Sequence, residues 1–396
     1  MIEITAALHR HRAEMERISL AIHSRPELCF EEHYAVSLLT TWLAGAGFSV
    51  ECPAGGLDTA FVARHEGSRP GPVVAVVMEY DALPDLGHGC GHNLIAAGGA
   101  LAAIVAAETV PDHVGTLLAI GTPAEEGGGG KIRMLEGGVF DGVDAALMFH
   151  PADRGLVARH GLSARSLGFR FHGRAAHAAK SPEEGRSALA AAQLFLTAVD
   201  MMRQFVPSTA RMHAIITNGG SAPQVVPALA EGRMLVRDLS DRGVASLVSR
   251  VTDAAHGAAR ATGCTADIYE YGPAYAARVN NMTLANRCSG YLAELGVSLE
   301  EPSSDNPAGS SDAGNLSLAV PMIHPYLQIA DRGTSSHSEA MREAARRPEA
   351  HERAALMAGA IARTALDALG DASFLEAVQA EFRAAVGAGA LTGSMP

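Results

Sequence analysis

The chain has 396 residues, of which 48% are hydrophobic and 19% are charged, and its formal net charge is −12. This composition excludes an intrinsically disordered chain, and the length predicts about two domains around a large buried core. The acidic balance also argues against nucleic acid and anionic membranes as partners, because both are bound by basic faces.

The cellular compartment is suggested by what the sequence lacks. Residues 1–23 are charged throughout and contain no apolar signal core. No apolar run reaches the ~18 residues that span a bilayer. Cysteines are scattered without paired spacing, which indicates free thiols; they are Cys29, Cys52, Cys90, Cys264 and Cys288. We therefore expect a cytoplasmic protein that does not interact with membranes.

The first part of the chain has the pattern of an α/β domain. Residues 8–47 are helical in pattern, and 94–108 have the pattern of an Ala-rich buried helix. Three apolar strands each end in polar residues, within 71–84, 115–131 and 143–151. Strands that alternate with helices predict a mostly parallel sheet with helices on both faces, and polar residues beyond the strand ends predict a site there.

The pattern changes near residue 164 and changes back near residue 274. Between them we predict a β-α-β-β-α-β order, typical of a ferredoxin-like α+β unit, with elements at 166–173, 188–205, 211–218, 229–238, 241–261 and 264–271. A strand at 319–330 and a helix at 349–369 then resume the α/β pattern. The predicted domains are thus a catalytic domain in two parts, 1–163 and 275–396, and an inserted lid or dimerisation domain, 164–274.

The segment "GHGCGHN" (87–93) places Cys90 and His92 two residues apart. In an extended loop this spacing points both side chains the same way, and thiolate and imidazole are both good zinc ligands. The alternative interpretation is a buried cysteine beside a histidine in a turn.

Glu125 and Glu126 follow the second apolar strand directly. Neighbouring side chains diverge, so one carboxylate can bind metal while the other accepts a proton from water. A solvated acidic turn is the alternative. The glycines at 127–130 favour the first interpretation, because they allow close packing or positive φ that a surface turn rarely needs.

Two further histidines complete a candidate ligand set. His150 closes the third strand, and His337 lies in a polar loop before the helix at 349–369. Each alone is more typical of a structural role. Together with Cys90, His92 and Glu126 they make more ligands than one zinc needs, and they suit two metals about 3.5–4 Å apart.

Six motifs spread along the chain resemble those of a known family. Its motifs are similar to those of the dinuclear metallopeptidases and amidohydrolases that include carboxypeptidase G, acetylornithine deacetylase, aminoacylase and the indole-acetyl-amino-acid hydrolases. The segment 79–93 is most similar to the aminobenzoyl-glutamate hydrolase and beta-alanyl-lysine dipeptidase group. The motifs are "IHSRPELCFEE" (22–32), "EYDALPDLGHGCGHN" (79–93), "GTPAEEGGGGK" (121–131), "FHGRAAHAAKSP" (171–182), "GSSDAGN" (309–315) and "SSHSEAM" (335–341).

The resemblance implies roles for the candidate residues. Two divalent metal ions, zinc first and manganese, cobalt or nickel as alternatives, would be held by Cys90, His92, Glu126, His150 and His337. Glu125 would be the general base that activates a metal-bridging water for attack on an amide carbonyl. The predicted function is a metal-dependent amidohydrolase or peptidase that acts on an N-acyl or aminoacyl amino acid or a similar small amide.

The resemblance also implies supporting residues. Asp81 would orient a ligand, and His177 would reach a partner subunit's site and stabilise the oxyanion. Arg237 would grip the substrate carboxylate. Gln224 stands where the family often has asparagine, and its extra methylene would shift the contact that the amide makes with the carbonyl or carboxylate end of the substrate. His88 is an alternative ligand to His92.

Three hypotheses follow from these residues. The first is the amidohydrolase, working as a homodimer formed through the inserted domain and without nucleic acid as a partner. The second is a non-catalytic relative that binds metal or ligand. The third is a hydrolase with Cys90 as nucleophile, which would leave the glutamate pair and His337 without a role.

Overall fold

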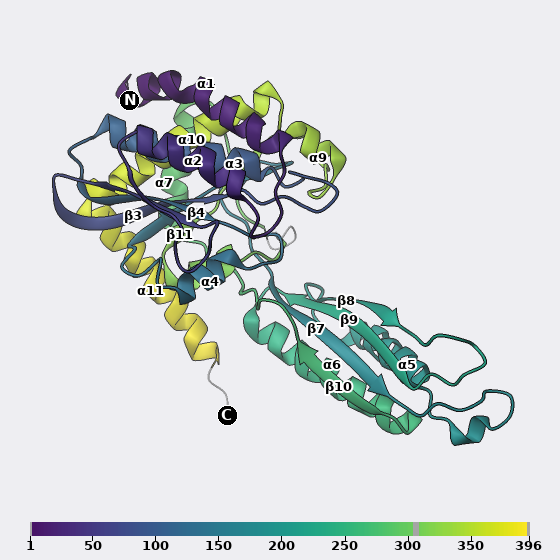
Figure 1. The fold of residues 1–396 in the computed structure, drawn as a ribbon. Coiled ribbons are helices and arrows are strands. Elements are labelled where there is room, and N and C mark those ends of the chain that lie inside the picture. Colours follow the sequence, from purple (N-terminus) through teal and green to yellow (C-terminus); the bar gives the residue numbers. More distant parts are fainter. Residues whose placement is uncertain (1, 304–308, 394–396) are drawn as a thin grey trace. The chain divides into compact units, whose positions relative to one another are not determined.

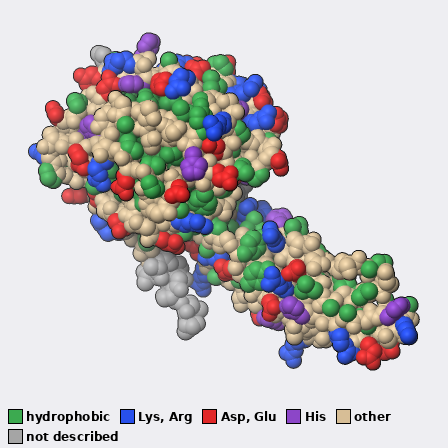
Figure 2. All heavy atoms as spheres, in the orientation of Figure 1, with side chains coloured by type: hydrophobic (Ala, Val, Ile, Leu, Met, Phe, Trp, Pro, Cys, Tyr) green, Lys and Arg blue, Asp and Glu red, His purple; other side chains and the backbone are tan. Residues whose placement is uncertain are grey.

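A computed structural model describes residues 2–303 and 309–393. The chain divides into two compact units, which can be followed by colour in Figure 1: unit 1 comprises residues 1–160 and 278–396, and unit 2 comprises residues 161–277. The predicted insertion, 164–274, starts and ends three residues inside unit 2. On the face shown in Figure 2, acidic and basic side chains are interspersed over each unit.

Unit 1 is built on a largely parallel six-stranded sheet in the order β1-β2-β4-β3-β5-β11. The strands β3 (Arg69–Glu79), β4 (Val114–Thr122), β5 (Ala145–Leu147) and β11 (Met322–Ile323) run parallel, and β2 (Phe61–Glu66) and β1 (Ser49–Glu51) add an antiparallel edge. The apolar run of β3 is buried on both faces, as expected for a central parallel strand.

Helices cover both faces of this sheet. The larger core packs one face against α1 (Ile2–Ser24), α2 (His33–Gly45), α3 (His92–Thr109), α7 (Met282–Glu294), α10 (Pro348–Gly370) and α11 (Ala372–Gly393). The opposite face packs against α4 (Gly130–Glu136) and α8 (Ala313–Ala319). A further short helix, α9 (Glu339–Ala344), follows the loop of His337. This arrangement confirms the predicted fold class.

Two predicted elements are wrong in detail. The segment 8–47 is not one helix, because Pro26 disfavours helical backbone at Arg25 and the chain turns before α2 begins. The strand expected at 319–330 is split into β11 and β12 (Tyr326–Gln328). The second half pairs with β6 (His150–Ala152) in a separate two-stranded parallel sheet.

Helix α3 is long and apolar enough to cross a membrane by length and composition, and 89% of its residues are buried inside the protein. It packs between the sheet and the helices α1 and α10. A helix that is apolar all round is expected in the centre of a large core, and this burial indicates that role.

Unit 2 is a four-stranded antiparallel sheet in the order β10-β7-β9-β8 with two helices on one face. Its elements are β7 (Ser163–His172), α5 (Ala188–Met202), β8 (Arg211–Asn218), β9 (Leu229–Asp238), α6 (Asp241–Thr262) and β10 (Thr265–Glu270), with single 3-10 turns at Pro182–Glu184 and Arg203–Phe205. The order is the predicted β-α-β-β-α-β. Leu167, Phe169 and Phe171 alternate along β7 and point into the core under the helices.

Candidate functional site

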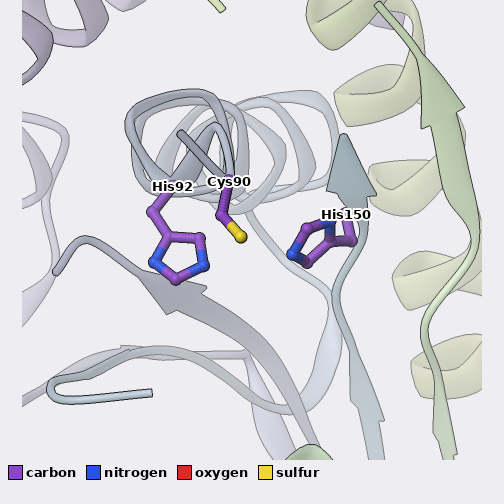
Figure 3. A group of neighbouring side chains, drawn as sticks. All are labelled: Cys90, His92 and His150. Carbon is purple, nitrogen blue, oxygen red and sulfur yellow. The ribbon is translucent and has the colours of Figure 1, made fainter. Parts of the chain in front are cut away.

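The structure gathers the predicted metal ligands of unit 1 into two overlapping groups. Cys90, His92 and His150 form one group, and Cys90, Glu126 and His337 form the other, with ligand atoms in each group within 4.8 Å of one another. Figure 3 shows the Cys90 sulfur between the two imidazoles of the first group. Cys90 belongs to both groups, which is the arrangement expected of a ligand shared by two ions.

The glycine-rich loop before α3 makes this convergence possible. Gly91 is the N-cap of α3 and has φ 77°, a conformation that favours glycine. A Cβ atom at this position would lie 2.9 Å from Pro151 Cγ. The glycine therefore lets the loop that carries Cys90 and His92 approach the strand that carries His150.

Asp81 holds His92 in the orientation that a metal ligand needs. His92 Nδ1 lies 2.9 Å from the Asp81 carbonyl oxygen and 3.1 Å from its carboxylate Oδ1. Both are acceptors, so Nδ1 carries a proton toward Asp81 and Nε2 is the nitrogen that faces the ligand groups. His92 Nε2 is buried without a hydrogen-bond partner, which leaves it available to a cation.

We expect Asp81→Asn to lower metal affinity by about 10–100-fold while the fold is retained. The amide keeps the shape but removes the negative charge. Burial by itself would raise the pKa of Asp81, but the contacts with His92, the Glu126 N–H and the charge of Lys131 together lower it to about 2. Titration of the metal-free protein with zinc, followed by competition with a chelator, measures the affinity. Wild-type affinity in the variant would contradict the orienting role.

The paired glutamates follow β4 and differ in their neighbours. Glu126 Oε2 lies 3.3 Å from His337 Nε2, which places this carboxylate in the second ligand group. Glu125 lies between two groups, one with His92 and Glu126 and the other with Glu79 and Asp312, each with ligand atoms within 4.8 Å of one another. The pKa of Glu125 is raised well above its ordinary value by burial and by the charges of Glu79 and Glu126.

The loop around the glutamates is tightly constrained. Ala124 has φ 58°, and its N–H donates to Glu32 Oε1 at 2.9 Å. A Cβ atom at Gly130 would lie 1.8 Å from the Pro123 carbonyl oxygen, so only glycine fits there. The glycines after the glutamates thus allow close packing, and the Glu32 carboxylate fixes the loop by accepting the hydrogen bond from Ala124 N–H.

Glu32 is fully buried, and burial raises its pKa to about 7. The unfolded chain ionises this group near pH 4.5, so the folded protein should lose stability as the pH rises from 4.5 to 7. Glu32→Gln keeps an acceptor for Ala124 N–H and removes this loss. We expect it to match wild type at pH 4 and to be more stable at pH 8 by about 1–3 kcal/mol. Denaturant unfolding at both pH values checks this, with exposed Glu31→Gln as control. Equal pH dependence in wild type and Glu32→Gln would contradict it.

A buried charge network beneath Glu125 was not predicted. The Lys131 ammonium lies 2.5 Å from Glu79 Oε1 and 2.8 Å from Asp312 Oδ1, and the Lys131 side chain is fully buried. All three residues lie in the motifs that carry the resemblance. Sequence reasoning passed over them because only the folded chain brings the ends of three segments together.

The charge balance of the site fits bound cations. Five carboxylates face one lysine; they are Glu79, Asp81, Glu125, Glu126 and Asp312. Glu126 Oε1, like His92 Nε2, is buried without a hydrogen-bond partner. Such a cluster is costly to bury unless cations compensate it. A thiol, imidazoles and carboxylates are suitable ligands for zinc and similar divalent ions.

His88 does not join either ligand group. It is buried, and its ring faces His23 at a centroid distance of 6.0 Å. Among the described residues the ligand groups contain His92 instead.

Three predicted residues lie in unit 2, at opposite ends of its sheet. His177 and Gln224 are both exposed; Val225, the residue next to Gln224, forms an isolated bridge with His177. Arg237 is half-buried near the end of β9, opposite Ala164, and its Nε has no hydrogen-bond partner. From the start of β9 to Arg237 the strand rises about 26 Å, so unit 2 does not bring Arg237 to His177.

The chain is similar to known proteins over most of its length. Residues 75–363 match the family model described as Peptidase family M20/M25/M40. The chain is 39% identical to a mouse Xaa-Arg dipeptidase over 389 residues, 92% of this chain and 88% of that protein. It is 36% identical to a p-aminobenzoyl-glutamate hydrolase subunit of Escherichia coli over 315 residues, 74% of this chain and 65% of that protein.

Solved structures share the fold. A dinuclear metal binding peptidase of the M20 family from Bacillus subtilis superposes with a TM-score of 0.73 at 21% identity, covering 92% of this chain and 99% of that chain. An aminobenzoyl-glutamate utilization protein from Klebsiella pneumoniae gives a TM-score of 0.70 at 21% identity, covering 92% and 98%. With 289 consecutive residues matched by the family model, the chain belongs to the peptidase family M20/M25/M40.

Proposed function

We propose that this peptide-bond hydrolase is a two-metal dipeptidase that prefers dipeptides with a basic C-terminal residue. The observation that carries the reaction class is the pair of ligand groups joined at Cys90, with Glu125 beside them. The substrate class is supported by similarity to Xaa-Arg dipeptidases along 92% of the chain. Family membership implies two divalent ions, and we propose zinc because a thiol is among the ligands.

The ligand groups suggest how two ions would be held. One would be bound by His92 and His150, the other by Glu126 and His337, with Cys90 shared. When bound, the ions would lower the pKa of water and polarise the substrate carbonyl.

The chain's own residues would move the proton. Glu125 lies with its carboxylate 3.9 Å from His92 Nε2, at the edge of the ligand groups. It would accept a proton from the attacking water and return it to the nitrogen of the leaving amine. Lys131, through Glu79 and Asp312, would hold the surroundings of Glu125 in place.

Unit 2 would contribute substrate contacts and a dimer interface. β8 is an edge strand of its sheet and exposes Ile215, while Phe205 is 75% exposed nearby in sequence. Exposed apolar side chains at an open sheet edge favour pairing with a second copy. In that homodimer His177 would serve the partner subunit's site, with Gln224 near the substrate and Arg237 on its carboxylate. Light scattering tests this: a monomer with full activity would contradict it.

The Cys90-nucleophile hypothesis is disfavoured by the same geometry. Burial raises the pKa of the Cys90 thiol, whereas a nucleophilic cysteine needs a lowered pKa. Chelation separates the two hypotheses, because it should abolish two-metal hydrolysis and spare a cysteine hydrolase. All five cysteines are free thiols in the structure, which supports our proposal of a cytoplasmic location.

The decisive experiment combines metal analysis with a substrate panel. The purified protein is loaded with zinc or manganese and assayed with alanyl-arginine, alanyl-lysine, alanyl-glutamate, N-acetyl amino acids and aminobenzoyl-glutamate. Preference for the basic dipeptides supports the proposal. Preference for aminobenzoyl-glutamate, which the similarity to the Escherichia coli hydrolase makes the second candidate, would overturn the substrate class. A metal-loaded protein that cleaves none of them would support a non-catalytic relative.

A further inference from the structure

A buried arginine lies one side chain away from His150 without an acidic partner. Arg278 is 7% exposed, and its Nη1 donates to Tyr326 Oη at 2.9 Å. Its Nε has no hydrogen-bond partner, and the part of unit 1 that the structure describes offers it no ion pair. A guanidinium stays charged in proteins, and burying it without an anion is costly. This arrangement indicates an anion that arrives from outside the chain.

A second buried side chain beside it is also unpartnered. His324 is 2% exposed, and neither ring nitrogen has a hydrogen-bond partner among the residues that the structure describes. An imidazole can carry an N–H on either ring nitrogen. The cluster therefore offers unused donors from two residues.

Tyr326 connects this cluster to the metal centre. Its ring centroid lies 5.1 Å from that of His324 and 5.6 Å from that of His150. Tyr326 and His150 are direct partners in the β6–β12 pairing, so both side chains leave the same small sheet side by side. Arg278 is thus held by a tyrosine that touches a predicted metal ligand.

We propose that Arg278, supported by Tyr326 and His324, is a carboxylate subsite that binds the α-carboxylate of the substrate's C-terminal residue. This inference rests on the proposed function, because a dipeptide or N-acyl amino acid carries such a carboxylate close to the bond that is cut. It adds a residue of unit 1 to a role that the sequence assigned to Arg237 alone.

The geometry of Arg278 favours a carboxylate over other anions. Tyr326 engages Nη1, so the edge of the guanidinium that carries Nε is left without a partner. That edge presents two parallel N–H groups, which match the two oxygens of a carboxylate.

The test compares alanyl-arginine with alanyl-argininamide, which differ only in the charge at the C-terminus. We expect zinc-loaded wild type to favour the acid in kcat/KM by about 10–100-fold, the range for a lost charge-assisted hydrogen bond. Arg278→Met should clearly lower this ratio, and the preference that remains would measure the contribution of Arg237. Arg278→Lys, which keeps the charge without the fork, should give an intermediate ratio and covers the case in which the methionine variant fails to fold. Arg353→Met, an exposed arginine of α10, is the matched control and should keep the wild-type ratio.

Three results would overturn the subsite. In the first, wild type cleaves the acid and the amide with equal kcat/KM. In the second, Arg278→Met and Arg278→Lys keep the wild-type ratio. In the third, the preference for the acid falls only in step with the metal content of the same samples. Calorimetric titration of the metal-loaded protein with arginine and argininamide repeats the comparison without turnover. If no dipeptide is cleaved but arginine binds more tightly than argininamide in an Arg278-dependent way, the proposed function fails and the subsite stands.

Discussion

Replacing Glu125 by glutamine is expected to lower kcat by about 10²–10⁴-fold while two metal ions remain bound. The amide keeps the size of the side chain but cannot accept a proton. Glu125 is outside both groups that join at Cys90, so its loss should spare the metals. Steady-state kinetics and elemental analysis on the same preparation measure both quantities.

Glu126→Gln is the matched variant for this experiment. Glu126 contacts His337 at 3.3 Å within a ligand group, so its amide should lower metal content as well as activity. Activity should fall in both variants, so metal content is the measurement that distinguishes Glu125→Gln from Glu126→Gln. A Glu125→Gln protein that keeps wild-type kcat, or one that loses metal as Glu126→Gln does, would refute the assignment of Glu125 as the proton carrier.

Cys90→Ala is expected to abolish activity and to reduce the bound metal from about two ions per chain to one or none. Cys90 is the member shared by the two ligand groups, so its removal weakens both sites at once. The thiol is buried, and alanine is smaller than cysteine, so the variant should still fold. Metal content per chain, measured beside wild type, is the readout.

Two controls make the Cys90 result specific. Cys288→Ala removes another buried thiol, in α7 and outside the ligand groups, and should keep full metal content. Added zinc should fail to restore activity to Cys90→Ala at concentrations that restore activity to wild type after chelation. Two tightly bound ions in Cys90→Ala would show that the shared ligand is another residue.

Much of the architecture could be predicted from the sequence, because hydrophobic periodicity reports which face of an element is buried. The alternation of Leu167, Phe169 and Phe171 predicted a half-exposed strand, and β7 has that form. The same reasoning failed at 319–330, where apolar composition alone cannot show that the chain changes sheets. Periodicity also missed the turn before α2, where Pro26 interrupts the helical pattern.

The candidate ligands could also be predicted from the sequence, because local patterns identify them. Polar residues just past buried strands, and Cys90 and His92 at a spacing of two, are local signals. Local signals could not decide between His88 and His92, which are both flanked by glycine. The folded chain separates them, because His92 meets Asp81 while His88 turns toward His23.

The sequence by itself thus determined the fold class, the family resemblance and a list of ligands, since each depends on residue type and near-neighbour spacing. Only the tertiary structure decided that Cys90 is common to both groups, that Lys131 pairs with both Glu79 and Asp312, and that Arg278 reaches Tyr326. Apart from Cys90 and His92, which are two positions apart, those contacts join residues that lie between 36 and 247 positions apart. Burial and charge pairing across such separations depend on packing, which no local pattern encodes.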